Sequence, residues 1–427
     1  MTSPERTTAG DVDRDEPEGW VGLLFLAGLV LLLALAGGLS TLIVVMAIVI
    51  MIFMHELGHY LTARSAGMKV TEFFLGFGPR IWSFRRGETE YGVKAIFAGA
   101  YVRIIGMNNL EEVDPADEVR TYRQAPFWRR LSVAVAGSTM HFLMAIAMLF
   151  VLFVGPGFRG FDIGTDVLTT DDWQVSSISE DSAAEAIGVM AGDRILGLDG
   201  VNLETFDELR AAVLDRPGET VTVIVGRDGE VLELTGVLGT NDEGMGFLGV
   251  GPQLVPAAPD NVVVAAGKSV EEFAVVTKES VVQIGLFFTP GGLSDFFAQV
   301  FEAGDEPAPE EASAPSQAGP DSDDEGRIIS IYGATRIGSA LTETGVEGLL
   351  EFMIILNIFI GVFNLMPLLP LDGGHVVIAV YERIRSRPGR RYHADVAKLL
   401  PLTYVVLFVL LSVGIAALYL DIRDPIV

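Results

Sequence analysis

The chain has 427 residues, 50% of which are hydrophobic, and its mean hydropathy is +0.43. This composition excludes an ordinary soluble protein, and the length allows a membrane core plus one further domain. A formal net charge of -27 argues against nucleic-acid binding, and the lack of cysteine excludes disulfides and any metal site with cysteine ligands.

The first predicted elements are a polar tail and a pair of membrane helices. Residues 1–19 are acidic and contain proline, which predicts a disordered tail. The uncharged block from Val21 to Met54 would form a helix of about 51 Å, far longer than the ~30 Å hydrocarbon core of a bilayer. A break at residues 37–40 therefore predicts two transmembrane helices within 20–63. The alternative is a signal peptide cleaved near Ala36, although the residues before it are acidic rather than basic.

The second of these helices carries the motif H-E-L-G-H at His55–His59. This spacing puts both histidines on one side of a helix, where they can bind one metal ion, and Glu56 can act as a general base on the metal-bound water. A charged side chain inside a membrane helix costs roughly 2.5–3.5 kcal/mol on insertion scales, so a glutamate here indicates a functional site. Gly58 is expected to permit close packing against a neighbouring helix. The sequence thus predicts a zinc protease centre within the membrane.

A third transmembrane helix is predicted at 128–154, and a long insertion follows it. Residues 173–255 combine short β-branched runs with turn signals and one helical pattern, which predicts a small β-rich domain. Residues 262–300 have apolar positions at helical spacing and are predicted to form an amphipathic segment. Residues 302–326 are rich in Pro, Ala, Ser, Asp and Glu, which predicts a disordered acidic linker.

Two more spans, at 349–382 and 398–420, bring the predicted number of membrane helices to five. Basic residues gather in 64–130 and 383–397, whereas acidic residues outnumber basic ones by about four to one from Arg159 to Val346. The positive-inside bias therefore predicts that the two basic segments are cytoplasmic and that the acidic insertion is extracytoplasmic. The predicted fold class is a polytopic α-helical membrane protein with about five transmembrane helices and an inserted small β-rich domain.

Asp372 is the candidate for a third metal ligand, because a catalytic zinc usually has three protein ligands and one open position. It follows a span that Pro367 and Pro370 interrupt. Non-helical backbone at membrane depth is tolerated only where it is buried in protein or lines a water-filled cavity. The two glycines after Asp372 would permit a close approach of the backbone. Alternatively, Asp372 only N-caps the next helix.

These motifs together resemble the site-2 protease family of intramembrane zinc metalloproteases. The resemblance rests on H-E-L-G-H at 55–59 and on the segment from Asn364 to Gly373, which contains Leu371-Asp372-Gly373. Residues 77–102 are similar to the membrane-associated β-hairpin region of this family, which places a cytoplasmic hairpin region at 64–127. Residues 189–195 resemble a signature of the PDZ domains in bacterial members.

The resemblance implies that His55, His59 and Asp372 bind Zn2+ and that Glu56 activates the attacking water. Asn364 would hold the substrate backbone or stabilise the oxyanion. The implied function is intramembrane proteolysis in a bacterial plasma membrane, with the H-E-L-G-H side toward the cytoplasm. The substrates would be single-span membrane-tethered regulators such as anti-sigma factors, cut after another protease has removed their outer part. The PDZ-like domain, outside the cell, would act as a size filter or bind an extended strand or C-terminus.

His141 marks a departure from the family pattern, because members commonly have Ala-Gly-Pro-x-x-Asn where this chain has Ala-Gly-Ser-Thr-Met-His at 136–141. His141 could donate a hydrogen bond in place of the Asn, act as a pH-sensitive gate or compete for zinc. The alternative is a buried histidine bonded to a neighbouring helix. His375 is expected to support the ligands rather than to be a fourth ligand. His393 is expected to be an ordinary surface residue.

Two other functions compete with proteolysis. A membrane metal-ion transporter would also use His, Asp and Asn within membrane helices, but it predicts more intramembrane acids and no PDZ-like domain. A catalytically silent PDZ scaffold is the other alternative. The presence of Glu56 together with all three presumed ligands argues against it.

Overall fold

The computed structural model describes residues 19–107, 111–155, 173–179, 182–203, 206–227, 229–241, 244–254, 260–305, 330–343, 345–387 and 392–423. The predicted tail at 1–19 and the predicted linker at 302–326 lie almost entirely outside these residues. Two compact units make up the chain. The first comprises Met1–Leu143, Ala334–Glu343 and Leu356–Ala416, and the second comprises Met144–Gly333, Thr344–Ile355 and Ala417–Val427.

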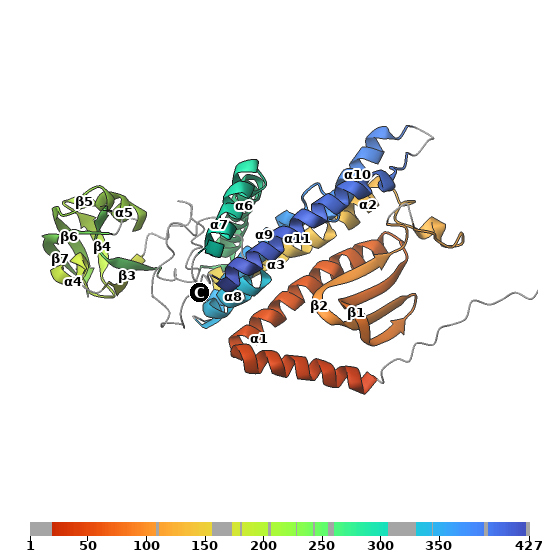
Figure 1. Cartoon of the computed structure of the whole chain (residues 1–427), viewed down its shortest axis with the longest axis horizontal. Coiled ribbons are helices and arrows are strands. Elements are labelled where there is room, and N and C mark those ends of the chain that lie inside the picture. Colours follow the sequence, from red (N-terminus) through yellow and green to blue (C-terminus); the bar gives the residue numbers. More distant parts are fainter. Residues whose placement is uncertain are drawn as a thin grey trace, which may run out of the picture. The chain divides into compact units, whose positions relative to one another are not determined.

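The first helix, α1 (Gly19–Ser65), bends at Gly38. The φ of Gly38 is 74°, in the left-handed region that glycine adopts without the steric cost incurred by other residues. Figure 1 shows α1 as two helical arms at an angle to each other. The predicted break near 37–40 is therefore confirmed.

Four helices in the described residues are long and apolar enough to cross a membrane. They are Gly37–Ser65 of α1, α3 (Ala136–Val154), α9 (Val346–Asn364) and Val396–Arg423, which comprises η3 (Val396–Leu399) and α11 (Leu400–Arg423). A fifth crossing results if α6 (Val262–Phe287) and α7 (Pro290–Asp305), which are bent by 75° at their junction, form one broken span. The predicted fold class, a polytopic helical membrane protein with about five spans, is confirmed.

Three segments differ in detail from the prediction. The arm of α1 before Gly37 is not among the four candidates, and the fifth candidate is instead the α6–α7 pair, for which an amphipathic segment was expected. The expected single helix at 128–154 is divided at Val135 into α2 (Phe127–Ala134) and α3. Because α2 carries Arg129 and Arg130, which are costly in hydrocarbon, the candidate membrane span begins only at Ala136.

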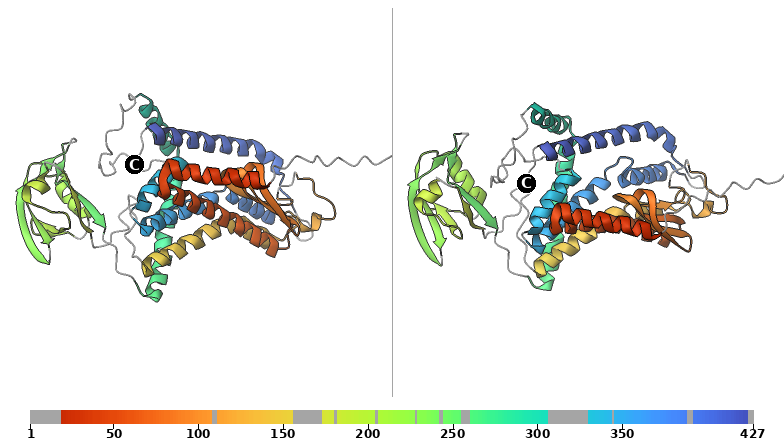
Figure 2. Two further views of the ribbon diagram at one scale, coloured as in Figure 1. Left: turned by 90° about the horizontal axis from the view of Figure 1, so that it is seen from below. Right: turned by 60° about the horizontal axis from the view of Figure 1, so that its bottom comes forward.

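A long antiparallel hairpin, β1 (Val70–Arg86) and β2 (Thr89–Ile104), follows α1. Both strands bend, so residues 72–75 pair on one side with residues 100–103 and on the other with residues 90–93. In the part of the chain that the structure describes, residues 100–104 pair only with β1 and form one edge of the sheet. The hairpin lies along the C-terminal turns of α1 (Figure 2), in a core of Tyr60, Ala63, Met68, Val70, Phe73, Ile104, Tyr122 and Val133.

Helix α10 (Asp372–Arg385) is attached to α2 by a buried ion pair. The side chains of Arg130 on α2 and Glu382 on α10 are 10% and 4% exposed, and their nearest N and O atoms are 2.5 Å apart. The other carboxylate oxygen of Glu382 accepts a hydrogen bond of 2.6 Å from the Ala394 N–H. Both oxygens are therefore satisfied, as a buried carboxylate requires. A further polar link joins Thr41 of α1 to Ser339 of α8 (Ile331–Glu343), at 3.2 Å.

The predicted β-rich domain is present in the insertion. Its elements are β3 (Trp173–Ile178), α4 (Ala183–Ile187), β4 (Arg194–Leu198), β5 (Val201–Asn202), α5 (Phe206–Leu214), β6 (Thr220–Arg227), β7 (Glu230–Val237), β8 (Gly239–Thr240), β9 (Gly246–Phe247) and β10 (Val250–Leu254). The largest sheet has the order β5-β4-β6-β7, and β3 pairs with β10. Alternating residues of these strands and one face of α5 fill a core centred on Trp173, Ile195, Leu209 and Val223.

Asp193 fixes the turn that leads into β4 of this domain. Its side chain is 1% exposed, and its two oxygens accept hydrogen bonds of 2.7 and 2.6 Å from Arg227 of β6. A third bond of 2.8 Å comes from the Met190 N–H. Burial alone would raise the pKa of Asp193, but these hydrogen bonds outweigh it and hold the pKa below its usual range.

We expect Asp193→Asn to destabilise the β-rich domain by about 2–3 kcal/mol, because Arg227 would lose its buried carboxylate. Hydrogen–deuterium exchange of the full-length protein should then show its protected amides exchanging at least about 30-fold faster at pH 7. Since the native pKa of Asp193 is depressed, its contribution is present above about pH 4 and is lost as the pH falls through the native value. The variant should therefore lack this part of the acid sensitivity.

Asp199→Asn is the matched control in the same domain. Asp199 also pairs with an arginine, Arg216, but the two side chains are 35% and 30% exposed. A half-exposed pair of this kind contributes under about 1 kcal/mol. An equal loss of domain stability in Asp193→Asn and Asp199→Asn would contradict the role assigned to the buried Asp193.

Candidate metal centre

Three side chains from two distant segments converge in the first unit. His55 and His59 lie one turn apart on α1, with their Nε2 atoms 3.2 Å from each other. Asp372 is the first residue of α10, and its Oδ2 lies 3.5 Å from Nε2 of His55 and 3.2 Å from Nε2 of His59. The ligand atoms of these three residues all lie within 4.8 Å of one another. Side-chain exposures of 13%, 7% and 16% leave the cluster largely enclosed.

The donor atoms of this cluster are oriented for a cation. Nδ1 of His59 donates a hydrogen bond of 2.8 Å to the Val133 carbonyl, so the lone pair of its Nε2 faces Asp372 and His55. Oδ2 of Asp372 is buried and accepts no hydrogen bond from the described residues. A buried unsatisfied carboxylate oxygen is costly, and a divalent cation would satisfy it. Two imidazole nitrogens and one carboxylate oxygen form a donor set that suits Zn2+ with one open position.

Asp372 does not act as a helix cap, so the alternative reading of this residue is wrong. The N-cap position of α10 belongs to Leu371, and no side chain caps this helix. The glycines after Asp372 are needed for packing, as predicted. A Cβ at Gly373 would run into the carbonyl oxygens of Leu365 and Met366, and a Cβ at Gly374 would meet residue 369 at 2.8 Å. The interrupted segment 365–371 therefore folds back on the start of α10.

Glu56 lies next to the cluster without belonging to it. The three grouped residues do not include Glu56, although it follows His55 directly on α1. Its carboxylate receives a hydrogen bond from the backbone N–H of Val102, in the edge segment 100–104 of the hairpin. Glu56 therefore contacts the edge segment 100–104 of the hairpin.

The N-terminal half of α3 forms one wall of the centre. A Cβ at Gly137 would occupy the position of the His55 ring, so only glycine leaves room for that imidazole. Gly58 has the corresponding role on α1, where a Cβ would meet Met140 at 2.6 Å, and the predicted close packing is confirmed. The ring of His141, one turn after Gly137, lies 5.0 Å from the ring of His55, centroid to centroid.

His141 is also bonded to a neighbouring helix, as its alternative reading expected. Its Nδ1 lies 2.9 Å from Oδ1 of Asn357 on α9, and the two residues are 1% and 0% exposed. Sequence reasoning missed Asn357. The signal was available, because an amide within the otherwise apolar run from Phe352 to Phe363 requires a buried partner.

The three-residue cluster does not include the remaining candidate residues. Asn364 is the half-buried last residue of α9. His375 packs against the ring of Tyr122, with centroids 6.4 Å apart, and does not belong to the group of ligand atoms. His393 is exposed, as expected.

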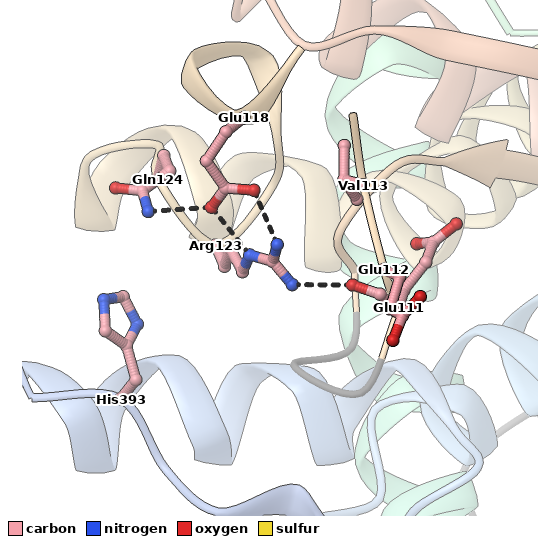
Figure 3. Close-up of a pocket in the computed structure, with 7 residues that line it drawn as sticks. All are labelled: Glu111, Glu112, Val113, Glu118, Arg123, Gln124 and His393. Atoms are coloured by element: carbon pink, nitrogen blue, oxygen red, sulfur yellow. Dashed lines mark hydrogen bonds and ion pairs between the residues drawn. The ribbon is translucent and has the colours of Figure 1, made fainter. Parts of the chain in front are cut away.

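A pocket of about 690 Å³ lies beside η1 (Glu118–Arg120), as Figure 3 shows. Its lining consists of Glu111, Glu112, Val113, Glu118, Arg123, Gln124 and His393. Hydrogen bonds from Arg123 and Gln124 lower the pKa of Glu118 to about 2. None of the metal-binding candidates contributes to this pocket, so it is separate from the centre.

The sequence is similar to a known peptidase family and to proteins named as zinc metalloproteases. The model of Peptidase family M50 matches residues 43–411. The zinc metalloprotease Rip1 of Mycobacterium tuberculosis (strain ATCC 25618 / H37Rv) is 31% identical over 404 residues, which cover 89% of this chain and 96% of that protein. Rip1 of Mycolicibacterium smegmatis is 29% identical over 420 residues, covering 91% and 98%. Among solved structures, the PDZ domain of the SdrC-like protein from Listeria monocytogenes matches 20% of this chain and 90% of that chain, with 22% identity and a TM-score of 0.18.

Proposed function

The chain belongs to peptidase family M50, the site-2 proteases, and from this premise we propose that it cleaves single-span membrane proteins inside the bilayer. It is a multi-pass membrane protein and a zinc metalloprotease, and membership of a peptidase family contradicts the transporter alternative. The observation that carries the proposal is the convergence of His55, His59 and Asp372 at the end of the span Gly37–Ser65. A proteolytic centre at that place acts on chains that are themselves in the membrane.

In this proposal His55, His59 and Asp372 hold the zinc ion, and Glu56 moves the proton. Zinc, when bound, supplies a Lewis acid that polarises the scissile carbonyl and acidifies the attacking water. The carboxylate of Glu56 accepts the proton of that water and returns it to the nitrogen of the leaving strand. Asn364 stabilises the oxyanion or holds the substrate backbone, and His141, whose Nδ1 is bonded to Asn357, holds the substrate backbone.

The edge of the hairpin is the proposed docking place for the substrate. A transmembrane helix must unwind before a peptide bond can be cut, and its freed backbone groups then need partners. Residues 100–104 offer such partners, because a substrate strand can add to a free sheet edge. The contact between Val102 and Glu56 supports this placement, since an added strand would lie beside the glutamate.

The β-rich domain is proposed to act outside the cell as a size filter. The acidic insertion that contains it and the basic segments 64–130 and 383–397 support an orientation with the metal centre toward the cytoplasm. Substrates with an intact outer domain would be excluded until another protease has shortened them. Membrane-tethered regulators such as anti-sigma factors fit this order of two cuts in a bacterial plasma membrane.

The test uses the full-length protein in liposomes with tagged single-span substrates. We expect cleavage of a substrate that lacks its outer domain, and at least about tenfold slower cleavage when a folded outer domain is retained. A zinc chelator should stop the reaction, and added Zn2+ should restore it. Removal of residues 173–254 should abolish the discrimination between the two substrates. Equal cleavage of both substrates by the intact enzyme would refute the filter, and absence of any cleavage would refute the proteolytic function.

A further inference from the structure

His141 lies beside the metal centre without belonging to it. Its ring is 5.0 Å from the ring of His55 and is 1% exposed. The group of atoms that can share one ion nevertheless contains only His55, His59 and Asp372 among the described residues. A third imidazole so close could complete a tetrahedral site, and a closed site of this kind has no position for the catalytic water.

The hydrogen bond to Asn357 determines which way the His141 ring is turned. Oδ1 of an amide can only accept, so Nδ1 of His141 carries the proton of this 2.9 Å bond. In the neutral ring the lone pair is then on Nε2. Asn357 is fully buried, so no water can replace it as an acceptor. Losing it would leave a buried donor unsatisfied, which is unfavourable.

The helices around His141 approach closely, which limits where the ring can go. A Cβ at Gly361, one turn after Asn357 on α9, would meet the Phe142 ring at 2.6 Å and Cβ of His141 at 3.2 Å. On the other side, the missing side chain at Gly137 is the space that the His55 ring fills. The imidazole of His141 is therefore enclosed between Asn357 and the metal centre.

We propose that Asn357 is a positioning residue that keeps His141 from becoming a fourth metal ligand. The inference rests on the proposed function, because it requires zinc held by His55, His59 and Asp372. The bond to Asn357 turns Nδ1 toward α9 and holds the ring where neither of its nitrogens lies within 4.8 Å of all three ligand atoms, so the open position stays free for water. A histidine at 141 is thus compatible with catalysis because Asn357 restrains it.

The test is Asn357→Leu in the full-length zinc-loaded protein, with the imidazoles around zinc counted by X-ray absorption. We expect two imidazoles in the wild type and three in the variant. Cleavage should fall by about 10–100-fold, the range typical for changes to residues that orient metal ligands. In Asn357→Leu/His141→Phe the count should return to two, since no third imidazole remains. A variant that keeps two imidazoles and full activity would overturn the proposal.

Ser138→Ala is the matched control, because it removes a buried polar group from the same wall. Ser138 is 1% exposed and its hydroxyl has no partner in the described residues, so the imidazole count should stay at two. A second test uses the wild type alone, so it does not depend on whether the Asn357 variant folds. The chain has only five histidines, so 15N spectra can resolve each ring, with His141 identified by its loss in His141→Phe. We expect the Nδ1–H tautomer for His141, and an Nε2–H tautomer would refute the proposed hydrogen bond to Asn357.

Failure of this inference can be told apart from failure of the proposed function. If the proposed ligand set is wrong, the wild type itself will bind no zinc or will show an imidazole count other than two. If only the inference is wrong, the wild type will show two imidazoles and cleave its substrate, and Asn357→Leu will do the same.

Discussion

Glu56→Gln should reduce cleavage by at least about 100-fold and leave the zinc content unchanged. General acid–base catalysis by a positioned side chain typically contributes 10²–10⁴-fold, and an amide cannot accept the proton of the attacking water. The Gln side chain has the same length, and its oxygen can still accept the hydrogen bond from Val102. Zinc should be retained because Glu56 is not one of the three grouped ligands. Zinc is measured by elemental analysis of the purified protein, and cleavage is measured with a tagged single-span substrate.

Glu112→Gln is the matched control for this experiment. Glu112 is an exposed glutamate in the same unit, in the pocket away from the metal centre, so the same chemical change should leave cleavage intact. Wild-type rates in Glu56→Gln would rule out its role as the base. Loss of zinc in Glu56→Gln would mean that the glutamate is itself a ligand.

Asp372→Ala should lose both zinc and activity. The change removes the only carboxylate among the three grouped residues and leaves two histidines, too few for a catalytic zinc site. Changes in outer-shell partners already cost 10–100-fold in metal affinity, so loss of a direct ligand should lower the affinity by at least about 100-fold. The affinity is measured by competition with a chromogenic zinc chelator, and the fold by circular dichroism.

His375→Ala provides the comparison for Asp372→Ala. His375 lies on the same helix, three residues further on, but packs against Tyr122. Its removal should leave zinc bound and lower the affinity less than the loss of Asp372 does, because His375 is not one of the three grouped ligands. If Asp372→Ala keeps its zinc and His375→Ala loses it, the third ligand has been assigned to the wrong residue.

The parts of the centre that were predictable from sequence depend on local geometry. Helical spacing alone brings His55 and His59 together, and the glycine at 38 breaks an overlong apolar block. Asp372 could be proposed as a ligand because the prolines before it interrupt a membrane helix. Its link to the distant histidines, however, came only from the resemblance to a known family. The expected roles of Glu56, Asn364 and His141 stay predictions, since they concern catalysis and substrate.

The parts that sequence reasoning missed depend on contacts between distant segments. Asn357 and His141 lie on different helices, and nothing in the spacing of either one specifies the other. The pair Arg130 and Glu382 was missed for the same reason. The double pairing of β1 was not visible either, because alternation along a strand gives its faces but not the identity of its neighbours.

The position of Asp372 at the start of α10 makes the metal ion a cross-link as well as a catalyst. His59 and Asp372 are separated by roughly 310 residues of chain, so a shared ion closes a very long loop. Binding free energy at such a site is also folding free energy. Because Arg130 and Glu382 hold α10 to α2 independently of the ion, metal loss should release only the first turn of that helix. In the apoenzyme, only the first turn of α10, which carries Asp372, would then be mobile, and the protein could bind the metal again without refolding.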